Sequence, residues 1–344
     1  MNPSQEKPLK VGVVGAGSWG TTLADLLARK GHCVTLWARE PEVVDGIRST
    51  RHNPFFVPEH EVSPALAVTS DIREAVDGVD LILLAVPSAH LRPSIHPIRE
   101  YLATAPMIVN VAKGLESGSG SRLSQVILEE VGTGNPSPPD RLAVLSGPNL
   151  ATEIAGGKIG ACVIACPRED IGVHLQEAFS LPTFRAYRHT DRTGVELGGT
   201  LKNIFAIGAG IVDGLGLGDN AKAAYLTRSL HEMVRLGTRL GGRPTTFYGL
   251  SGLGDLMATA ASPLSRNHRL GQALARGEKA SDILSHSRMV VEGVETTRMA
   301  AEWGKRLTIS LPITEEISRV LFDDLSPREA ARNLMTRSLK DEEE

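Results

Sequence analysis

The sequence VGVVGAGSWG, at Val11–Gly20, decides the fold that we expect for this chain. Its apolar start predicts a buried strand, and Gly15, Gly17 and Gly20 follow at the spacing of a dinucleotide-binding turn. In such a turn the first glycine permits a tight bend, the second lets a pyrophosphate approach the backbone, and the third lets the next helix pack closely. The helical pattern at Thr21–Arg29 supplies an N-terminus whose N–H groups bind negative charge. This stretch therefore predicts a dinucleotide site.

Short apolar runs alternate with helical segments after this turn, a pattern typical of a doubly wound, mostly parallel sheet of the Rossmann type. Runs without polar alternation indicate strands that crossover helices bury on both faces. In NPFFVP each proline biases the preceding residue toward an extended conformation, so an ordered loop is expected. We expect strands at Cys33–Arg39, Val79–Val86, Met107–Val111, Leu142–Leu145, Ile159–Ala165 and Phe184–Tyr187.

From Gly194 onward the apolar residues recur every three or four positions, which predicts helices instead of strands. We therefore expect a dinucleotide-binding Rossmann domain at 1–192 and an α-helical substrate-binding domain at 193–344. A small-molecule site between two domains is a common arrangement.

Composition excludes several classes of partner. The formal net charge of −3 over 344 residues gives no basis for binding nucleic acid or an anionic membrane. The first residues lack the apolar core of a signal peptide, and no later stretch runs eighteen apolar residues without a charge. We expect a soluble, cytoplasmic protein that does not insert into membranes.

Cysteine and histidine spacing predicts neither disulfides nor a metal site. The three cysteines, Cys33, Cys162 and Cys166, lie in apolar runs without a CxxC pair, so we expect reduced core residues. His231–Glu232 resembles the start of HExxH, but the second histidine is absent.

The residues after the second predicted strand bear on the choice of cofactor. About twenty residues past the glycines, where a ribose-reading side chain is expected, stand Ala38, Arg39 and Glu40. An arginine can pair with a 2′-phosphate, whereas an acidic residue there favours the free ribose hydroxyls. Arg39 favours NADP(H) and Glu40 keeps NAD(H) possible, while a solvated charged pair at a strand end is the structural alternative.

Three polar constellations stand in apolar or glycine-rich surroundings. Lys113 follows a predicted strand at the ligand edge of the sheet, and Lys202 lies in the apolar helical pattern ELGGTLKNIFAIGAG. Burial lowers the pKa of a lysine toward values useful in proton transfer, although a snorkelling stem is the alternative. Asp255 follows a glycine-rich turn, and Ser265–Asn267 opens a helix whose arginine and N–H groups suit a phosphate. Asp255 could equally be a helix cap and Arg266 a solvated residue.

Taken together, the motifs resemble one family. Between Lys10 and Met335 the sequence is similar to bacterial NAD(P)-dependent sn-glycerol-3-phosphate dehydrogenase. The segments that carry the resemblance are GAGSWG, NPFFVP, VAKG, SGPNLATEI, ELGGTLKN, GLGDNAKAA, GLSGLGDL with SRN, and VVEG.

This resemblance implies a reaction and a role for each matching residue. A hydride would move between nicotinamide and C2 of glycerol 3-phosphate, interconverting it with dihydroxyacetone phosphate, usually in the reductive direction for phospholipid synthesis. Lys202 would be the general base or acid. Asp255 would touch the substrate and position Lys202. The resemblance assigns the substrate to Lys113, Gly147, Asn149, Ser265, Arg266 and Asn267, and the dinucleotide to Ser18, Trp19, Arg39, Lys113, Ala151, Arg266, Val290 and Glu292. A homodimer is also implied.

Two positions depart from the family pattern. Asn149 replaces the usual small hydroxyl residue after SGP, and Ala260 replaces a cysteine. A related β-hydroxyacid or ketopantoate-type reductase is the alternative enzyme, although the SRN helix start favours phosphate over carboxylate. A binding module that senses the dinucleotide without catalysis would have no use for Lys113, Lys202 and Asp255 in these settings.

Overall fold

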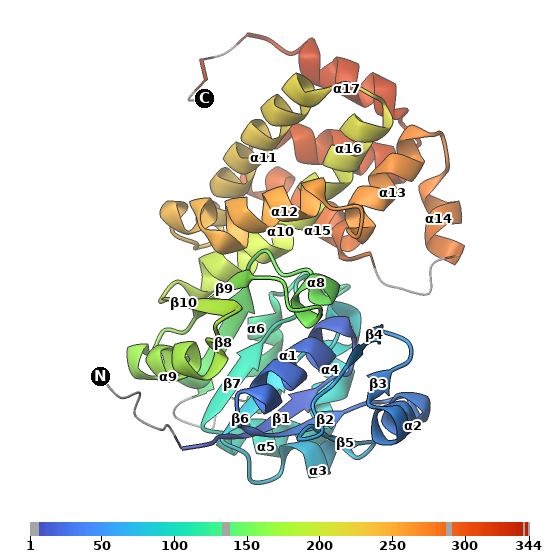
Figure 1. The fold of residues 1–344 in the computed structure, drawn as a ribbon. Helices are drawn as coiled ribbons and strands as arrows, with labels where there is room; N and C mark the ends of the chain where they lie inside the picture. The colour runs from blue at the N-terminus through green and yellow to red at the C-terminus, as the bar shows by residue number, and fades with distance from the viewer. Residues whose placement is uncertain (1–6, 133–137, 287–290, 340, 343–344) are drawn as a thin grey trace. The chain divides into compact units, whose positions relative to one another are not determined.

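The chain folds as two units, a sheet-containing unit at Met1–Glu196 and a helical unit at Leu197–Glu344 (Figure 1). The computed structural model describes residues 7–132, 138–286, 291–339 and 341–342. The long helix α10 (Arg192–Gly214) begins in the first unit and continues in the second.

The first unit is built on an eight-stranded sheet in the order β10-β9-β8-β7-β6-β1-β2-β5. All neighbouring strands are parallel except β8 and β9. This arrangement confirms the predicted doubly wound, mostly parallel sheet. The strands are β1 (Lys10–Val14), β2 (Cys33–Trp37), β5 (Ala67–Thr69), β6 (Leu81–Leu84), β7 (Met107–Asn110), β8 (Leu142–Ser146), β9 (Gly160–Ala165) and β10 (Phe184–His189).

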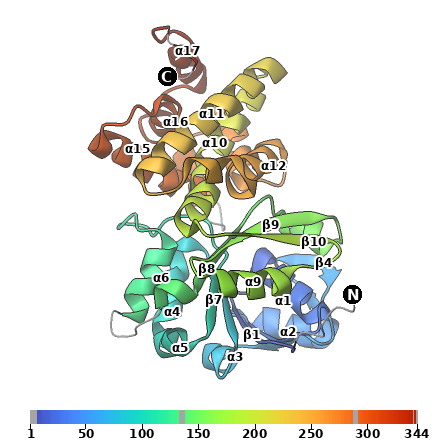
Figure 2. The same ribbon diagram turned by 90° about the vertical axis from the view of Figure 1, so that its left-hand side faces the viewer.

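Helices cover both faces of this sheet, as Figure 2 shows. Alternate residues of each strand enter opposite cores, because successive strand side chains point to opposite faces. In β6, Leu81 and Leu83 join the core beneath α1, α2 and α9, whereas Ile82 and Leu84 join the core beneath α3 to α6. The helices of this unit are α1 (Ser18–Arg29), α2 (Pro41–Thr50), α3 (Ile72–Val76), α4 (Leu91–Ile95), α5 (Arg99–Thr104), α6 (Leu123–Val131), α7 (Pro138–Arg141), α8 (Ala151–Ala155) and α9 (Glu169–Phe179).

The structure corrects two expectations about the first unit. The segment expected as a loop at NPFFVP contains parts of an antiparallel pair, β3 (His52–Asn53) and β4 (Val57–Glu61). A proline is tolerated in β4 because this two-stranded sheet has open edges. Cys33 is exposed at the start of β2, so the expectation of a core residue was wrong there, whereas Cys162 and Cys166 are buried.

Helices alone form the second unit within the described residues. They are the rest of α10, α11 (Asp219–Arg239), α12 (Asp255–Ala261), α13 (Arg266–Ala275), α14 (Ala280–His286), α15 (Glu292–Leu307), α16 (Pro312–Phe322) and α17 (Pro327–Met335). A π-helical turn at Leu250–Gly254 precedes α12.

Glycines let α10 and α13 cross with their backbones in contact. A Cβ added at Gly271 would lie 1.9 Å from the carbonyl oxygen of Ile207, and one at Gly210 would lie 2.0 Å from that of His268. Such distances are far inside van der Waals contact, so neither position can hold a larger residue without separating the helices. This crossing fixes the start of α13 against the middle of α10.

Glu232 is buried in this unit and caps α16. It accepts hydrogen bonds from the backbone N–H groups of Ile313 and Thr314 at 2.6 and 3.1 Å. Burial raises its pKa to about 7, although these donors act in the opposite direction. The His231–Glu232 pair, which resembled a metal motif, thus has a structural role at Glu232.

Among the described residues, α10 is long and apolar enough by composition to cross a membrane. The continuous eighteen-residue segment that meets this criterion is entirely buried inside the protein, as expected for the central helix of a helical core.

Candidate active site

The glycine-rich turn joins β1 to α1 and has the geometry predicted for it. Gly15 adopts a φ of 111°, which favours glycine, and a Cβ at Gly20 would lie 1.9 Å from the Gly15 carbonyl oxygen. A Cβ at Gly17 would meet no atom of the described chain within 4 Å. The tight bend and the close helix packing are therefore confirmed, and the backbone at Gly17 borders open space.

The first turn of α1 suits an anionic group. Gly17 is the N-cap residue, and the turn contains no acidic side chain. The Ser18 hydroxyl donates to the Phe56 carbonyl at 2.9 Å, while the Trp19 ring packs edge-on against Phe184. The indole Nε1 of Trp19 is buried and has no hydrogen-bond partner in the structure. The absence of acidic side chains at this described helix start is compatible with a pyrophosphate.

Arg39 lies just past the end of β2, as expected. Its side chain is 70% exposed and its guanidinium pairs with Glu40 at 2.7 Å. The two residues considered for ribose recognition therefore form one ion pair at the surface. A 2′-phosphate could compete with Glu40 for the Arg39 guanidinium.

The turns after β7 and β8 meet at the sheet edge. The Lys113 ammonium donates to the Gly147 carbonyl at 2.9 Å. Asn149, at the first departure from the family pattern, donates its amide N–H to the Ala161 carbonyl at 3.0 Å. Its Oδ1 is buried and has no hydrogen-bond partner among the described residues. Ala151 begins α8, and its carbonyl accepts from Thr22 of α1 at 3.4 Å. Lys113 thus joins the turn after β7 to the turn after β8, and Thr22 joins α1 to the start of α8.

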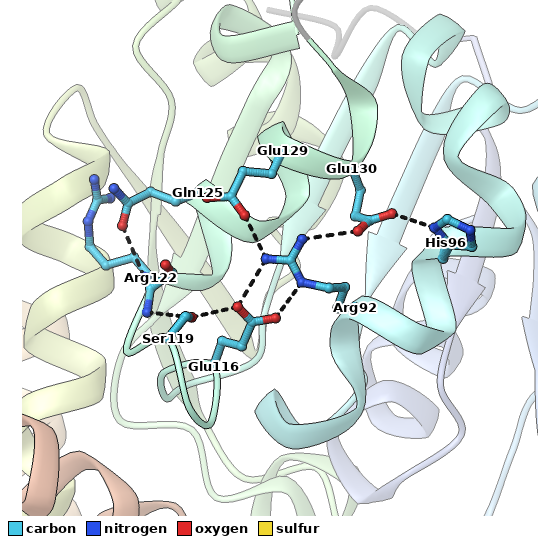
Figure 3. A network of polar contacts seen from close by, with 9 residues as sticks. Arg92, His96, Glu116, Ser119, Arg122, Gln125, Glu129 and Glu130 are labelled. Atoms are coloured by element: carbon cyan, nitrogen blue, oxygen red, sulfur yellow. Dashed lines mark hydrogen bonds and ion pairs between the residues drawn. The ribbon is translucent and has the colours of Figure 1, made fainter.

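A network centred on Arg92 anchors the loop that follows Lys113 (Figure 3). Arg92, from α4, binds both carboxylate oxygens of Glu116 in the loop and also pairs with Glu129 and Glu130 of α6. The hydrogen bond from Arg92 holds the pKa of Glu116 below its usual range. Ser119 closes the loop by donating to Glu116 at 2.6 Å. Sequence reasoning missed this network, because no local pattern links α4 to α6.

In the second unit Lys202 belongs to a buried polar cluster. Its ammonium lies 3.0 Å from Asp255 Oδ1 and donates to the Thr259 hydroxyl at 2.6 Å. The same hydroxyl donates to Asp255 at 3.1 Å. The side chains of Lys202 and Asp255 are 9% and 3% exposed. Lys202 is thus held by a carboxylate inside the helical core, and Asp255 stands at the first position of α12, not at its N-cap.

Thr259 was absent from the sequence-based candidates. Its position four residues after Asp255 places both on one face of α12, so helical spacing was a usable signal.

A second polar cluster joins α10, α13 and α15. Asn267 donates to the side-chain oxygen of Asn203 at 2.9 Å and accepts from the backbone N–H of Gly293 at 3.1 Å. A Cβ at Gly293 would lie 2.6 Å from the Asn267 side-chain oxygen, so this approach requires glycine. Asn267, expected at the phosphate, is thereby also a link between three helices.

The remaining candidates surround the start of α13. Ser265 is its N-cap and accepts from the His268 backbone N–H at 3.2 Å, which confirms that SRN opens a helix. Arg266 is exposed on the first turn, and Glu292 opens α15. Val290 lies outside the described residues.

The fold and these clusters define a class of protein. The first unit has a Rossmann-type sheet with a glycine turn suited to an anion, and the second has a buried lysine–aspartate pair. This combination is typical of a dinucleotide-dependent oxidoreductase. The described residues hold no group of three or more His, Cys, Asp or Glu side chains able to bind a metal ion.

Comparison with known proteins gives the family. The NAD-dependent glycerol-3-phosphate dehydrogenase N-terminus matches residues 10–172, and the corresponding C-terminus matches residues 191–332. The chain belongs to this family. It is 45% identical over 337 residues to the glycerol-3-phosphate dehydrogenase [NAD(P)+] of Syntrophotalea carbinolica, covering 97% of this chain and 99% of that one.

Solved structures agree with this assignment. The glycerol-3-phosphate dehydrogenase of Coxiella burnetii superimposes with a TM-score of 0.88 at 36% identity, covering 96% of this chain and 99% of that one. A ketopantoate reductase from Ralstonia eutropha reaches a TM-score of 0.58 at 19% identity, with coverage of 94% and 100%, a likeness of fold alone. The comparison thus favours the first of the two enzyme classes considered.

Proposed function

We propose that this protein is an NAD(P)-dependent sn-glycerol-3-phosphate dehydrogenase that reduces dihydroxyacetone phosphate reversibly to sn-glycerol 3-phosphate. The observation that carries the proposal is the buried cluster of Lys202, Asp255 and Thr259 in a chain of this family. Burying an ammonium in a helical core is costly unless it is paired, and apolar side chains could fill the same space without an ion pair. Packing alone therefore does not account for this cluster.

The first unit would hold the cofactor. The backbone N–H groups at Gly17 and Ser18 would bind the pyrophosphate, Trp19 would contact the adjacent part of the dinucleotide, and Arg39 would bind a 2′-phosphate. Ala151 would add a contact from this unit, and the resemblance suggests Arg266, Val290 and Glu292 as further contacts from the second unit. When bound, the reduced dinucleotide supplies the hydride for reduction of the substrate carbonyl.

Lys202 would supply the proton for that step. In reduction, negative charge develops on the C2 oxygen, and the Lys202 ammonium would donate a proton to this oxygen; in oxidation the neutral amine would accept it. Asp255 and Thr259 would hold the ammonium in one direction. A lysine so oriented needs no metal ion to stabilise the oxygen.

The phosphate of the substrate would bind at the start of α13. Arg266 supplies a guanidinium, Ser265 a hydroxyl, Asn267 an amide, and the first turn its N–H groups. Lys113, with Gly147 and Asn149, would contact the rest of the substrate. We therefore assign the phosphate of the substrate and the proton donor to residues of 193–344, and the pyrophosphate of the dinucleotide to residues of 1–192, while Lys113, Gly147 and Asn149 would add substrate contacts from 1–192.

The family resemblance also suggests a metabolic role and an oligomeric state. The reductive direction would supply glycerol 3-phosphate for phospholipid synthesis by a cytoplasmic homodimer. Light scattering of the purified protein tests the dimer.

One assay tests the activity. NADPH oxidation would be followed with dihydroxyacetone phosphate, ketopantoate and a β-ketoacid as separate substrates. We expect oxidation with dihydroxyacetone phosphate only; turnover of ketopantoate instead would assign the protein to the alternative reductase class.

A further inference from the structure

Asn53 lies at the end of β3 and is fully buried against the glycine-rich turn. Its amide Nδ2 donates to the Ala16 carbonyl and to the Thr21 hydroxyl, both at 2.9 Å. The Thr21 hydroxyl in turn donates to the same Ala16 carbonyl at 3.1 Å. Two donors from different segments thus hold one carbonyl oxygen in the middle of the turn.

That carbonyl determines the direction of the neighbouring amide. The Ala16 carbonyl and the Gly17 N–H belong to one planar trans peptide, in which the two bonds point in opposite directions. Fixing the oxygen toward Asn53 and Thr21 therefore turns the Gly17 N–H away from the protein interior. A Cβ built on Gly17 would meet no described atom within 4 Å, so the turn borders open space at this residue.

The oxygen of Asn53 holds its own segment in place. Asn53 Oδ1 accepts from the backbone N–H groups of Phe55 and Phe56, each at 3.3 Å. Pro54 packs against α2 at Gly46, where a Cβ would lie 2.8 Å from its ring. The amide therefore uses its donor and acceptor sides to join the β3–β4 segment to the glycine-rich turn.

We propose that Asn53 is a positioning residue for the dinucleotide, acting through the Ala16–Gly17 peptide, and that Thr21 shares this role. The inference rests on the proposed dinucleotide site. Neither residue needs to touch the ligand, because the peptide plane transmits the orientation. The effect falls on the pyrophosphate, which NADH and NADPH have in common.

The test compares four variants by titrating NADH and NADPH against protein fluorescence. In Asn53→Ala we expect the Kd of both dinucleotides to rise by the same factor, roughly tenfold, because the Ala16 oxygen loses one of its two donors. We expect kcat at saturating NADPH and the KM for dihydroxyacetone phosphate to stay within about twofold of wild type. Thr21→Val should raise both Kd values in the same way, and Thr21→Ser, which keeps the hydroxyl, should not.

Gln176→Ala is the matched control. Gln176 also donates its amide to a backbone carbonyl, that of Ala186 at 3.0 Å, but this bond joins α9 to β10. The Gln176→Ala substitution should lower the melting temperature without changing the Kd of NADH or of NADPH. If Asn53→Ala does not fold, Thr21→Val carries the same test.

Wild-type Kd values in folded Asn53→Ala or Thr21→Val would overturn the inference, as would a rise confined to NADPH. Failure of the wild type to bind either dinucleotide would instead overturn the proposed function, and the inference with it.

Discussion

The two units build their polar sites in different ways. In the first unit, Gly15, Gly17 and Ser18 are neighbours in the chain, and the backbone itself would form the proposed dinucleotide site. In the second unit, Lys202 and Asp255 are more than fifty residues apart in the chain and meet through their side chains. A backbone site can be recognised from a short sequence, whereas a side-chain site depends on how helices cross.

We expect the largest loss of activity from a substitution in the second unit. Lys202→Ala should lower kcat by ~10²- to 10⁴-fold, the usual contribution of a general acid–base group. The Kd of NADPH should stay at the wild-type value, because Lys202 is assigned to the substrate and not to the dinucleotide. Stopped-flow turnover and fluorescence titration measure the two quantities; wild-type turnover would remove Lys202 from the mechanism.

The helix crossing of the second unit can be tested with a pair of glycines. Gly271→Ala should lower the free energy of unfolding by at least ~3 kcal/mol, because its Cβ would overlap the Ile207 carbonyl.

Gly172, in α9 of the first unit, is the control. A Cβ there would meet only the Cys166 side chain, at 4.0 Å, so Gly172→Ala should be neutral or slightly stabilising. Urea unfolding gives both values, and equal effects would contradict the close backbone crossing.

Glu232 should make the folding stability of the protein depend on pH. Its pKa rises from 4.5 in the unfolded chain to about 7 in the folded protein. The unfolded state therefore loses the proton first, and folding stability falls by a few kcal/mol as the pH rises from about 4.5 to about 7, with no further loss above.

Glu232→Gln should remove this dependence, so that the variant gains stability relative to wild type between pH 5 and pH 8. The amide oxygen of the introduced glutamine would still accept one hydrogen bond from the start of α16. Unfolding free energies at the two pH values measure the gain, and a constant difference between the proteins would rule the titration out.

The smallest expected effect concerns Arg39 in the first unit. Arg39→Ala should lower kcat/KM for NADPH roughly three- to tenfold more than for NADH, the range of an exposed charged hydrogen bond. Steady-state kinetics with both dinucleotides measure the ratio. Equal losses would show that another group reads the 2′-phosphate.

Sequence reasoning succeeded where the structure is local. The strand, the turn at Gly15 and the close packing at Gly20 follow from adjacent residues, and the core strands β6, β7 and β8 follow from continuous apolar runs. Strand β5 was not expected, because three residues are too few to show a period. Cys33 was misplaced because an apolar run does not show that its first residue points outward.

The rest of the candidate site depends on contacts between distant segments. Helical spacing from Asp255 could have identified Thr259, but nothing near Asn203 in the sequence indicates that it binds Asn267. Asn53 likewise gave only the expectation of an ordered loop, since its partners at Ala16 and Thr21 lie more than thirty residues away. Such pairs become visible only when the fold brings the segments together.

The central claim is that the two sites serve one reaction, a hydride transfer to a phosphorylated ketone. The most direct test supplies NADPH carrying deuterium at both C4 positions together with dihydroxyacetone phosphate, and analyses the product by mass spectrometry and NMR. We predict glycerol 3-phosphate with one deuterium, located at C2. NADPH consumption without deuterium at C2, or no consumption at all, would contradict the account.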